Sequence, residues 1–166
     1  MVEQQEASED AVMTRIGQAV MLLHGGDREE ARNRFGLLWS ELGADGDALH
    51  RCTLAHYMAD TQDDPGDELA WDLRALTAAE ALSGDRPDGH RDSLAVQALC
   101  PSLHLNLAAD YLKLQRPDAA RIHLRQARDA ADRLEGGGSG ARGAHSGYDG
   151  GVRAAIDRLE LRMRGM

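Results

Sequence analysis

The sequence predicts an all-α fold. Three features indicate it: apolar residues recur at three- and four-residue spacing, polar turns with glycine or proline interrupt them, and small residues stand where neighbouring helices would touch. All three occur together in residues 103–134, LHLNLAADYLKLQRPDAARIHLRQARDAADRL. The 166-residue length suits one domain, so we expect a single compact unit.

The first pair of helices is expected in residues 9–42. Apolar side chains lie at helical spacing over residues 12–23, the turn HGGD at residues 24–27 interrupts them, and the pattern resumes over residues 31–42. The polar, acidic residues 1–8 are expected to form a disordered tail.

The second pair is expected in residues 47–82. Asp64 and Pro65 indicate the start of its second helix, because proline is tolerated in a first turn and acidic residues complement the helix dipole. Residues 83–92 are rich in helix breakers and predict a loop. Residues 93–99 predict a short helical turn, since Pro101 disfavours helix at the residue before it. This turn either kinks into the third pair or stops just before it.

The third pair is expected in residues 101–134. Residues 135–151 are rich in glycine and predict a flexible linker. Residues 152–166 return to an amphipathic helical pattern. We expect this last helix to cover the apolar side of the third pair.

Residues 103–134 resemble a tetratricopeptide repeat. The positions that carry the resemblance are Leu107, Ala108, Tyr111, Ala120, Leu124 and Ala127. The first pair matches the same pattern at Ala19, Gly26, Ala31 and Phe35. Gln115 departs from it, since a glycine usually ends the first helix of the hairpin. The chain is similar to tetratricopeptide-like proteins of actinobacteria, which implies a right-handed solenoid of three helical hairpins with a C-terminal capping helix.

The resemblance also implies where a partner would bind. In this family the first helix of each hairpin lines a concave groove that binds peptides or proteins. Transferred position by position, the groove residues are Ile16, Val20, Leu23, Leu49, Cys52, His56, Asp60, Leu105, Asn106, Ala109, Leu112 and Lys113. We therefore expect a non-enzymatic adaptor or scaffold that binds an apolar or amphipathic segment of another protein.

An apolar groove would promote aggregation if it stayed empty, so we expect one of three occupants to fill it. The chain's own helix at residues 152–166 could fill it and act as a lid that a partner displaces. A second copy could fill it, giving a structural homodimer. A segment of another protein could dock there as a helix in a groove.

A small-molecule or metal-binding groove is the alternative function. His56 and Asp60 are four residues apart, so they share a helix face and could contribute to a metal site or an acid–base pair. A solvated pair is the more common arrangement, and a metal needs a third ligand. The sequence contains no phosphate-binding loop and no activated nucleophile motif, so we expect no enzyme and no cofactor.

Charge and composition limit which other ligands and cellular locations are expected. The net charge of −9 disfavours binding to nucleic acid and to anionic membrane surfaces. Without a signal peptide or a long apolar run, a cytoplasmic location is expected. Cys52 and Cys100 are expected to be buried, reduced thiols. The preference for arginine over lysine suggests a GC-rich bacterial source.

Two residue groups are assigned to structure rather than to a site. Trp39 and Trp71 are expected to pack between helices, because large aromatic side chains are usually buried. The acidic residues around the second turn are expected to cap a helix in water, and they are Asp63, Asp64, Asp67, Glu68 and Asp72.

Overall fold

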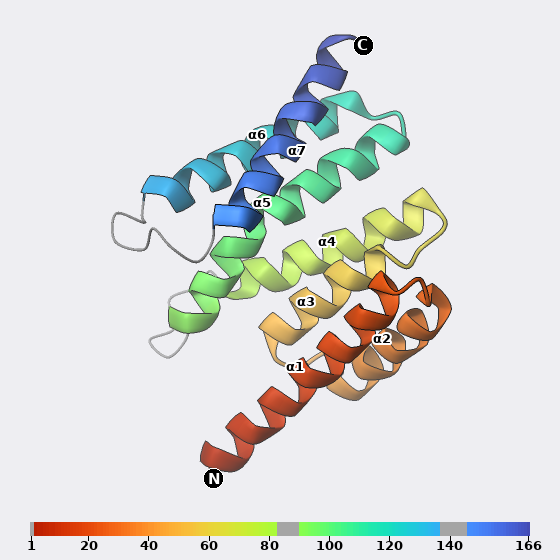
Figure 1. Ribbon diagram of the computed structural model, residues 1–166, viewed down its shortest axis with the longest axis vertical. Helices are drawn as coiled ribbons and strands as arrows, with labels where there is room; N and C mark the ends of the chain where they lie inside the picture. The colour runs from red at the N-terminus through yellow and green to blue at the C-terminus, as the bar shows by residue number, and fades with distance from the viewer. Residues whose placement is uncertain (1, 83–89, 137–145) are drawn as a thin grey trace. The chain divides into compact units, whose positions relative to one another are not determined.

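The computed structural model describes residues 2–82, 90–136 and 146–166, and in these ranges it contains seven α-helices and no strand (Figure 1). The helices are α1 (Val2–His24), α2 (Arg28–Leu42), α3 (Ala48–Ala59), α4 (Pro65–Leu82), α5 (His90–Lys113), α6 (Pro117–Gly136) and α7 (Ser146–Arg164). The predicted all-α class is confirmed. In the described ranges, no helix is both long enough and apolar enough to span a membrane.

Two compact units make up the chain, Met1–Ala81 and Leu82–Met166, where the length had predicted one. The reason is visible in the core, because each unit buries its own cluster of apolar side chains. Each unit is therefore described separately.

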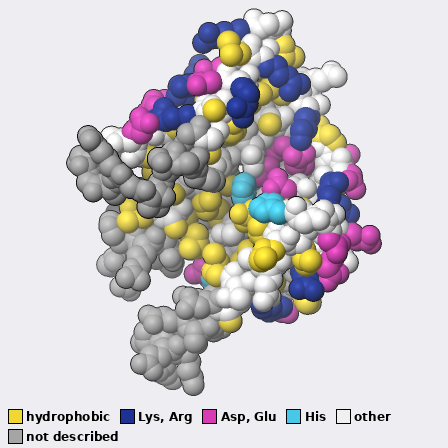
Figure 2. Space-filling view, viewed as in Figure 1, with side chains coloured by type: hydrophobic (Ala, Val, Ile, Leu, Met, Phe, Trp, Pro, Cys, Tyr) yellow, Lys and Arg dark blue, Asp and Glu magenta, His cyan; other side chains and the backbone are white. Residues whose placement is uncertain are grey.

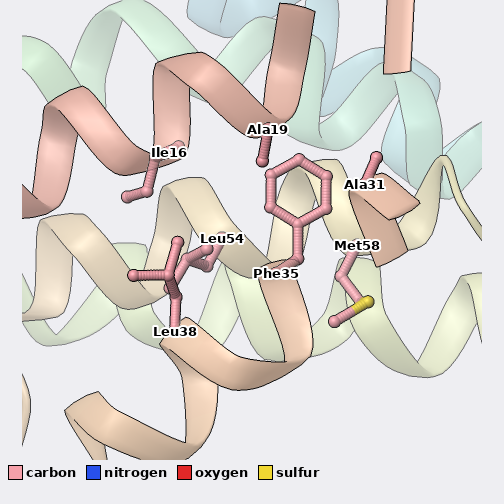
Figure 3. Close-up of a cluster of buried hydrophobic side chains, with 7 residues drawn as sticks. All are labelled: Ile16, Ala19, Ala31, Phe35, Leu38, Leu54 and Met58. Atoms are coloured by element: carbon pink, nitrogen blue, oxygen red, sulfur yellow. The ribbon is translucent and has the colours of Figure 1, made fainter. Parts of the chain in front are cut away.

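The first unit is built on the hairpin of α1 and α2, with α3 packed against both helices. Phe35 of α2 is fully buried, and its ring points toward Ala19 of α1 (Figure 3). The buried cluster around it comprises Ile16, Ala19, Ala31, Phe35, Leu38, Leu54 and Met58. These residues come from three helices, so the core fixes α1, α2 and α3 together.

Aspartate side chains cap the helices of this unit. Asp47 accepts a hydrogen bond from the backbone N–H of His50 at 3.0 Å, at the start of α3. Asp64 accepts from the N–H groups of Gly66 and Asp67 at 2.8 and 3.1 Å, at the start of α4. These contacts satisfy N–H groups that a helix cannot pair internally, and they bear out the predicted start of α4.

The second unit consists of the α5–α6 hairpin and α7, which packs against both helices. Small residues stand at the contact between α5 and α6, where Ala108, Ala120 and Ala127 are fully buried. Ile156 and Met163 of α7 complete the buried cluster. The small side chains let the α5 and α6 backbones approach closely, as the sequence pattern predicts.

The turns inside the α1–α2 and α5–α6 hairpins have the same backbone geometry. The N–H of Asp27 donates to the carbonyl of Leu22 at 2.9 Å, and the N–H of Arg116 donates to the carbonyl of Tyr111 at 2.8 Å. Each bond closes over a residue with positive φ, which is Gly26 (φ 93°) in the first turn and Gln115 (φ 59°) in the second. This is the arrangement in which a left-handed residue ends a helix.

Several predicted boundaries differ from the structure. Helix α1 includes residues 2–8, which were expected to form a tail. Their sequence contains two glutamates, two glutamines and one alanine, which favour helix. Helix α5 runs unbroken through Pro101, where a loop to residue 92 and a short turn were expected. Proline removes only one backbone hydrogen bond, and Pro101 and Leu103 are both buried, so packing offsets that loss.

The predicted linker at residues 135–151 is also shortened from both ends. Helix α6 continues to Gly136 and α7 begins at Ser146. Residues 137–145 of that linker, and residues 83–89 of the predicted loop, lie outside the described residues.

Candidate functional site

Two of the predicted groove residues in the first unit are buried. Ile16 is 2 % exposed and belongs to the core cluster, and Cys52 has no exposed surface. Ile16 was assigned to the groove because it lies on the first helix of a hairpin, but its side chain packs between helices. These two positions contribute to the fold, and in this structure neither offers a surface to a partner.

The other positions of the first unit retain some exposure. Val20 and Leu23 of α1 are partly buried against the core cluster, and Leu49 at the start of α3 is half-buried. Asp60 is exposed just after the end of α3. Three partly exposed apolar residues and one exposed carboxylate thus remain accessible among the predicted groove positions considered so far.

His56 of α3 lies beside a carboxylate that the sequence did not suggest. Its Nδ1 is 4.0 Å from Oδ1 of Asp72 on α4, and the Asp72 side chain is 2 % exposed. The expectation that Asp72 is solvated with the acidic residues of the turn is therefore wrong. It occupies a position on α4 that faces the protein interior, one turn beyond the acidic helix start.

Burial controls the protonation of His56. Desolvation lowers the pKa of its imidazole, and the negative charge of Asp60 acts in the opposite direction. The Asp60 charge thus reaches His56, as their four-residue spacing predicts. In the described parts of the chain, no three His, Cys, Asp or Glu side chains are grouped so that they could hold a metal ion.

The acidic turn between α3 and α4 is engaged by arginines of α2. Asp63 pairs with Arg28 at 2.8 Å and with Arg32 at 3.4 Å. Arg28 and Arg32 also donate to the backbone carbonyls of Gln62 and Thr61, respectively. The turn is therefore tied to α2, and part of its negative charge is already compensated.

The two tryptophans pack on one another, as expected. Trp39 of α2 and Trp71 of α4 meet edge to face, with ring centroids 5.1 Å apart. The guanidinium of Arg51 lies 4.2 Å from the Trp39 ring, and that of Arg74 lies 4.3 Å from the Trp71 ring. These contacts join three helices of the first unit and combine aromatic with cation–π attraction.

In the second unit, the predicted groove residues lie along α5. Leu105 and Leu112 are partly buried against the cluster that α7 completes. Asn106 and Ala109 are half-buried, and Lys113 is exposed at the end of the helix. The groove positions on α5 are therefore mostly apolar, and the charged one, Lys113, lies next to the turn between α5 and α6.

Helix α7 covers the side of the α5–α6 hairpin. Arg128 of α6 binds Asp157 at 2.5 Å and Glu160 at 2.8 Å, and Arg153 of α7 binds Asp132 at 3.0 Å. These ion pairs flank the buried Ile156. The predicted C-terminal helix therefore packs on the α5–α6 hairpin.

A cluster that sequence reasoning missed joins α5 to α6. The Nδ1 atoms of His104 and His123 are 3.1 Å apart, and the ring of His123 lies 5.4 Å from that of Tyr111 between centroids. Burial lowers the pKa of His104 to about 4, helped by the nearby His123 and Arg133, and burial also lowers the pKa of His123. The only signal in the sequence was that His104 stands where the repeat pattern favours a larger apolar residue.

The cysteines differ in environment. Cys52 is buried as expected, but Cys100 is only half-buried, and burial raises the pKa of its thiol. Neither cysteine forms a disulfide in the described part of the chain.

Comparison of the chain with models of known families, with curated proteins and with solved structures finds no match in any of the three.

Proposed function

We propose that this chain is a tetratricopeptide-like protein, a right-handed solenoid of three helical hairpins with a capping helix. We further propose that it works without catalysis, as an adaptor or scaffold. Its partner would be an apolar or amphipathic segment of another protein, bound on the first helices of the hairpins. The proposal rests on a packing scheme that recurs in the two units.

The recurrence involves three helices each time. In the first unit, α1 and α2 form a hairpin and α3 packs on both; in the second, α5 and α6 form a hairpin and α7 packs on both. Such nearest-neighbour packing, repeated along the chain, is typical of helical repeat proteins. A single bundle with one shared core would not be expected to repeat the same arrangement of three helices.

The residues at the hairpin contacts recur as well. Ala19 and Ala108 are fully buried on the first helices, Ala31 and Ala120 are fully buried on the second, and one sequence offset relates both pairs. The same offset relates Gly26 to Gln115, the two positive-φ residues of the turns. Equivalent residues thus have equivalent roles, which supports one repeat unit used twice.

The binding surface follows from this assignment. Among the predicted groove positions, Leu49 on α3 and Ala109 on α5 are partly exposed. Partly exposed apolar positions on first helices are suited to the apolar face of a docked segment. They are also positions where an added charge would repel such a segment without entering a core cluster.

Affinity capture from a lysate of the source organism tests the proposal. The tagged protein is compared with its Leu49→Glu and Ala109→Glu variants by quantitative mass spectrometry. We expect each variant to reduce the capture of a partner by about tenfold or more, because a charge placed in an apolar contact is strongly unfavourable.

Leu73→Glu is the matched control, since Leu73 is a 38 % exposed leucine on α4, outside the groove set. It should retain the partner. Circular dichroism must show the same helicity for all variants. If Leu49→Glu and Ala109→Glu keep every partner that the unmodified protein captures, the groove does not bind them and the proposed function fails.

A further inference from the structure

A second surface, separate from the groove positions, is a pocket between α6 and α7. Its volume is about 460 Å³, within the range of sites that accept a large side chain or a small ligand. Its floor is apolar, and its rim is formed by arginines. The residues that line it include Arg121, Leu124, Arg125, Met163, Arg164 and Met166.

The floor is part of the folded core. Leu124 is 4 % exposed and Met163 is 6 % exposed, and both belong to the cluster that holds α7 on the hairpin. The pocket is therefore supported by rigid packing. Methionine at its edge suits an occupant of variable shape, because the thioether side chain is flexible and polarizable.

The arginines of α6 and α7 fall into two groups. Arg128 and Arg153 form ion pairs across the two helices and hold them together. Arg125 and Arg164, by contrast, form no ion pair with any residue in the described ranges. These two arginines are thus available at the rim of the pocket.

The other charges at the pocket do not neutralise this rim. Glu160 also lines the pocket, but Arg128 holds both of its carboxylate oxygens at 2.8 and 2.9 Å. Arg121 pairs with Asp118 at 3.1 Å, a contact whose carboxylate is 97 % exposed and therefore weak. The pocket presents an apolar floor with an excess of positive charge around it.

This charge is unusual for the chain. The net charge is −9, yet residues 82–166 contain slightly more Arg and Lys than Asp and Glu, so the excess acid lies in residues 1–81. Figure 2 shows arginine and lysine side chains gathered over the end of the second unit where Figure 1 places the C-terminal half of α7. The acidic excess of the chain therefore does not extend to this surface.

We propose that this pocket binds an acidic amphipathic segment of a partner protein. One aliphatic side chain of the segment enters the pocket over Leu124 and Met163, and flanking carboxylates pair with Arg125 and Arg164. Guanidinium groups match carboxylates in a bidentate geometry, which gives this pairing its specificity.

The pocket favours a peptide over other anions for two reasons. A nucleic acid or an anionic membrane brings many phosphates, and the net charge of −9 disfavours binding to such polyanions. A short acidic segment brings few charges, and it alone offers an aliphatic side chain to the apolar floor. The site lies on α6 and α7 and goes beyond the proposed groove function.

Fluorescence anisotropy tests the site with a defined probe. The probe is a fluorescein-labelled helical peptide of about three turns, with leucine at the centre of one face and glutamate one turn to either side. We expect binding that weakens with salt, and that is lost when the two glutamates are replaced by glutamine or the leucine by serine.

The second part of the test reverses the charge of the two pocket arginines. Arg125→Glu and Arg164→Glu should each lower the affinity for the probe by about tenfold or more, because an attractive charge pair becomes a repulsive one. Arg158→Glu is the control, because it makes the same charge change at another exposed site on α7. It should lower the affinity for the probe by less than about threefold. If a reversal lowers helicity, Arg125→Gln and Arg164→Gln replace it, with a smaller loss expected.

Four results would overturn the proposal. The first is that the probe does not bind, and the second is that Arg158→Glu weakens probe binding as much as the pocket variants do. The third is tighter binding to phosphatidylglycerol vesicles or to oligo-deoxythymidylate than to the probe. The fourth is self-association, seen by sedimentation velocity, that Arg125→Glu abolishes. The last result would place a second copy in the pocket. Loss of groove partners in the capture experiment leaves this test unaffected, because its variants lie on other helices.

Discussion

Gln115 shows how a single residue can keep a backbone conformation that its own chemistry disfavours. It has φ 59° at the turn between α5 and α6, at the position where Gly26 has φ 93° in the first hairpin. A residue with a Cβ is strained in this region, and glycine is not. The turn is maintained by its hydrogen bonds and by the packing of α5 on α6.

Gln115→Gly should therefore stabilise the protein, by about 1 kcal/mol, as the left-handed conformation becomes unstrained. Urea unfolding monitored by circular dichroism measures the difference. Gln126→Gly is the control, because Gln126 is exposed within α6, and there glycine should destabilise by about 1 kcal/mol. Equal effects of the two changes would show that φ at residue 115 is not the cause.

His104 and His123 form a second feature at the residue scale. With Nδ1 atoms 3.1 Å apart, one imidazole must donate and the other must accept, so the contact requires at least one neutral ring. The pKa of His104 is lowered from 6.5 to about 4, first by burial, then by His123 and Arg133. Protonation of both rings opposes the packing of α5 on α6.

Stability should consequently fall as the pH decreases from about 6.5 toward 4. In that window the unfolded His104 binds a proton that the folded protein excludes, so acid favours unfolding, and the stabilisation is complete above pH 6.5. The effect should be of order 1 kcal/mol, reduced because the ring is only partly buried. Urea unfolding at pH 7 and pH 5 measures it.

His104→Gln should reduce the difference between the two pH values, whereas His24→Gln, which removes an exposed histidine from α1, should leave it unchanged. A pH dependence that persists in His104→Gln would contradict this assignment. Buried carboxylates would then be the next groups to replace.

At the scale of elements, α7 is held by an apolar anchor between ion pairs. Ile156 is 1 % exposed, while Arg128 and Arg153 tie α7 to α6 on either side of it. The buried Ile156 should contribute most of the free energy that holds α7 in place. Partly exposed ion pairs contribute little to stability, whereas a buried isoleucine contributes several kcal/mol.

Ile156→Asp should release α7 from the hairpin, since it places an unpaired charge in an apolar contact. Hydrogen exchange followed by mass spectrometry should show faster exchange over residues 151–164, with little change over α1–α3. Leu161→Asp is the matched control, because Leu161 is 65 % exposed on the same helix, and it should leave exchange unchanged. Equal exchange in the two variants would mean that the ion pairs alone keep α7 in place.

Several elements were predictable because local signals and tertiary packing agree in them. The turn residues and buried alanines of the α1–α2 and α5–α6 hairpins follow from glycine, proline and periodic apolar residues. Helix α5 was not predictable, because the burial of Pro101 and Leu103 overrides the local rule that proline disfavours helix at the residue before it. Propensity describes one residue, and packing decides whether the helix continues.

At the scale of the whole molecule, the candidate site was less predictable than the fold. The repeat pattern assigned a face to Ile16, but only packing shows that its side chain enters the core. Asp72 could not be separated from the exposed acidic residues by composition, and the arginine-rimmed pocket on α6 and α7 requires two helices that the predicted linker separates. Sites that depend on two distant segments leave no local signal.

The way α7 packs has a consequence for how such a chain could change in length. It meets α6 and α5 by the scheme through which α3 meets α2 and α1. A duplicated hairpin inserted after α6 could offer α7 an equivalent surface, provided that its alanines and apolar anchors were copied with it. In-frame duplication of one hairpin-sized segment would then lengthen the protein by a complete module, and the existing helices would need no compensating substitutions.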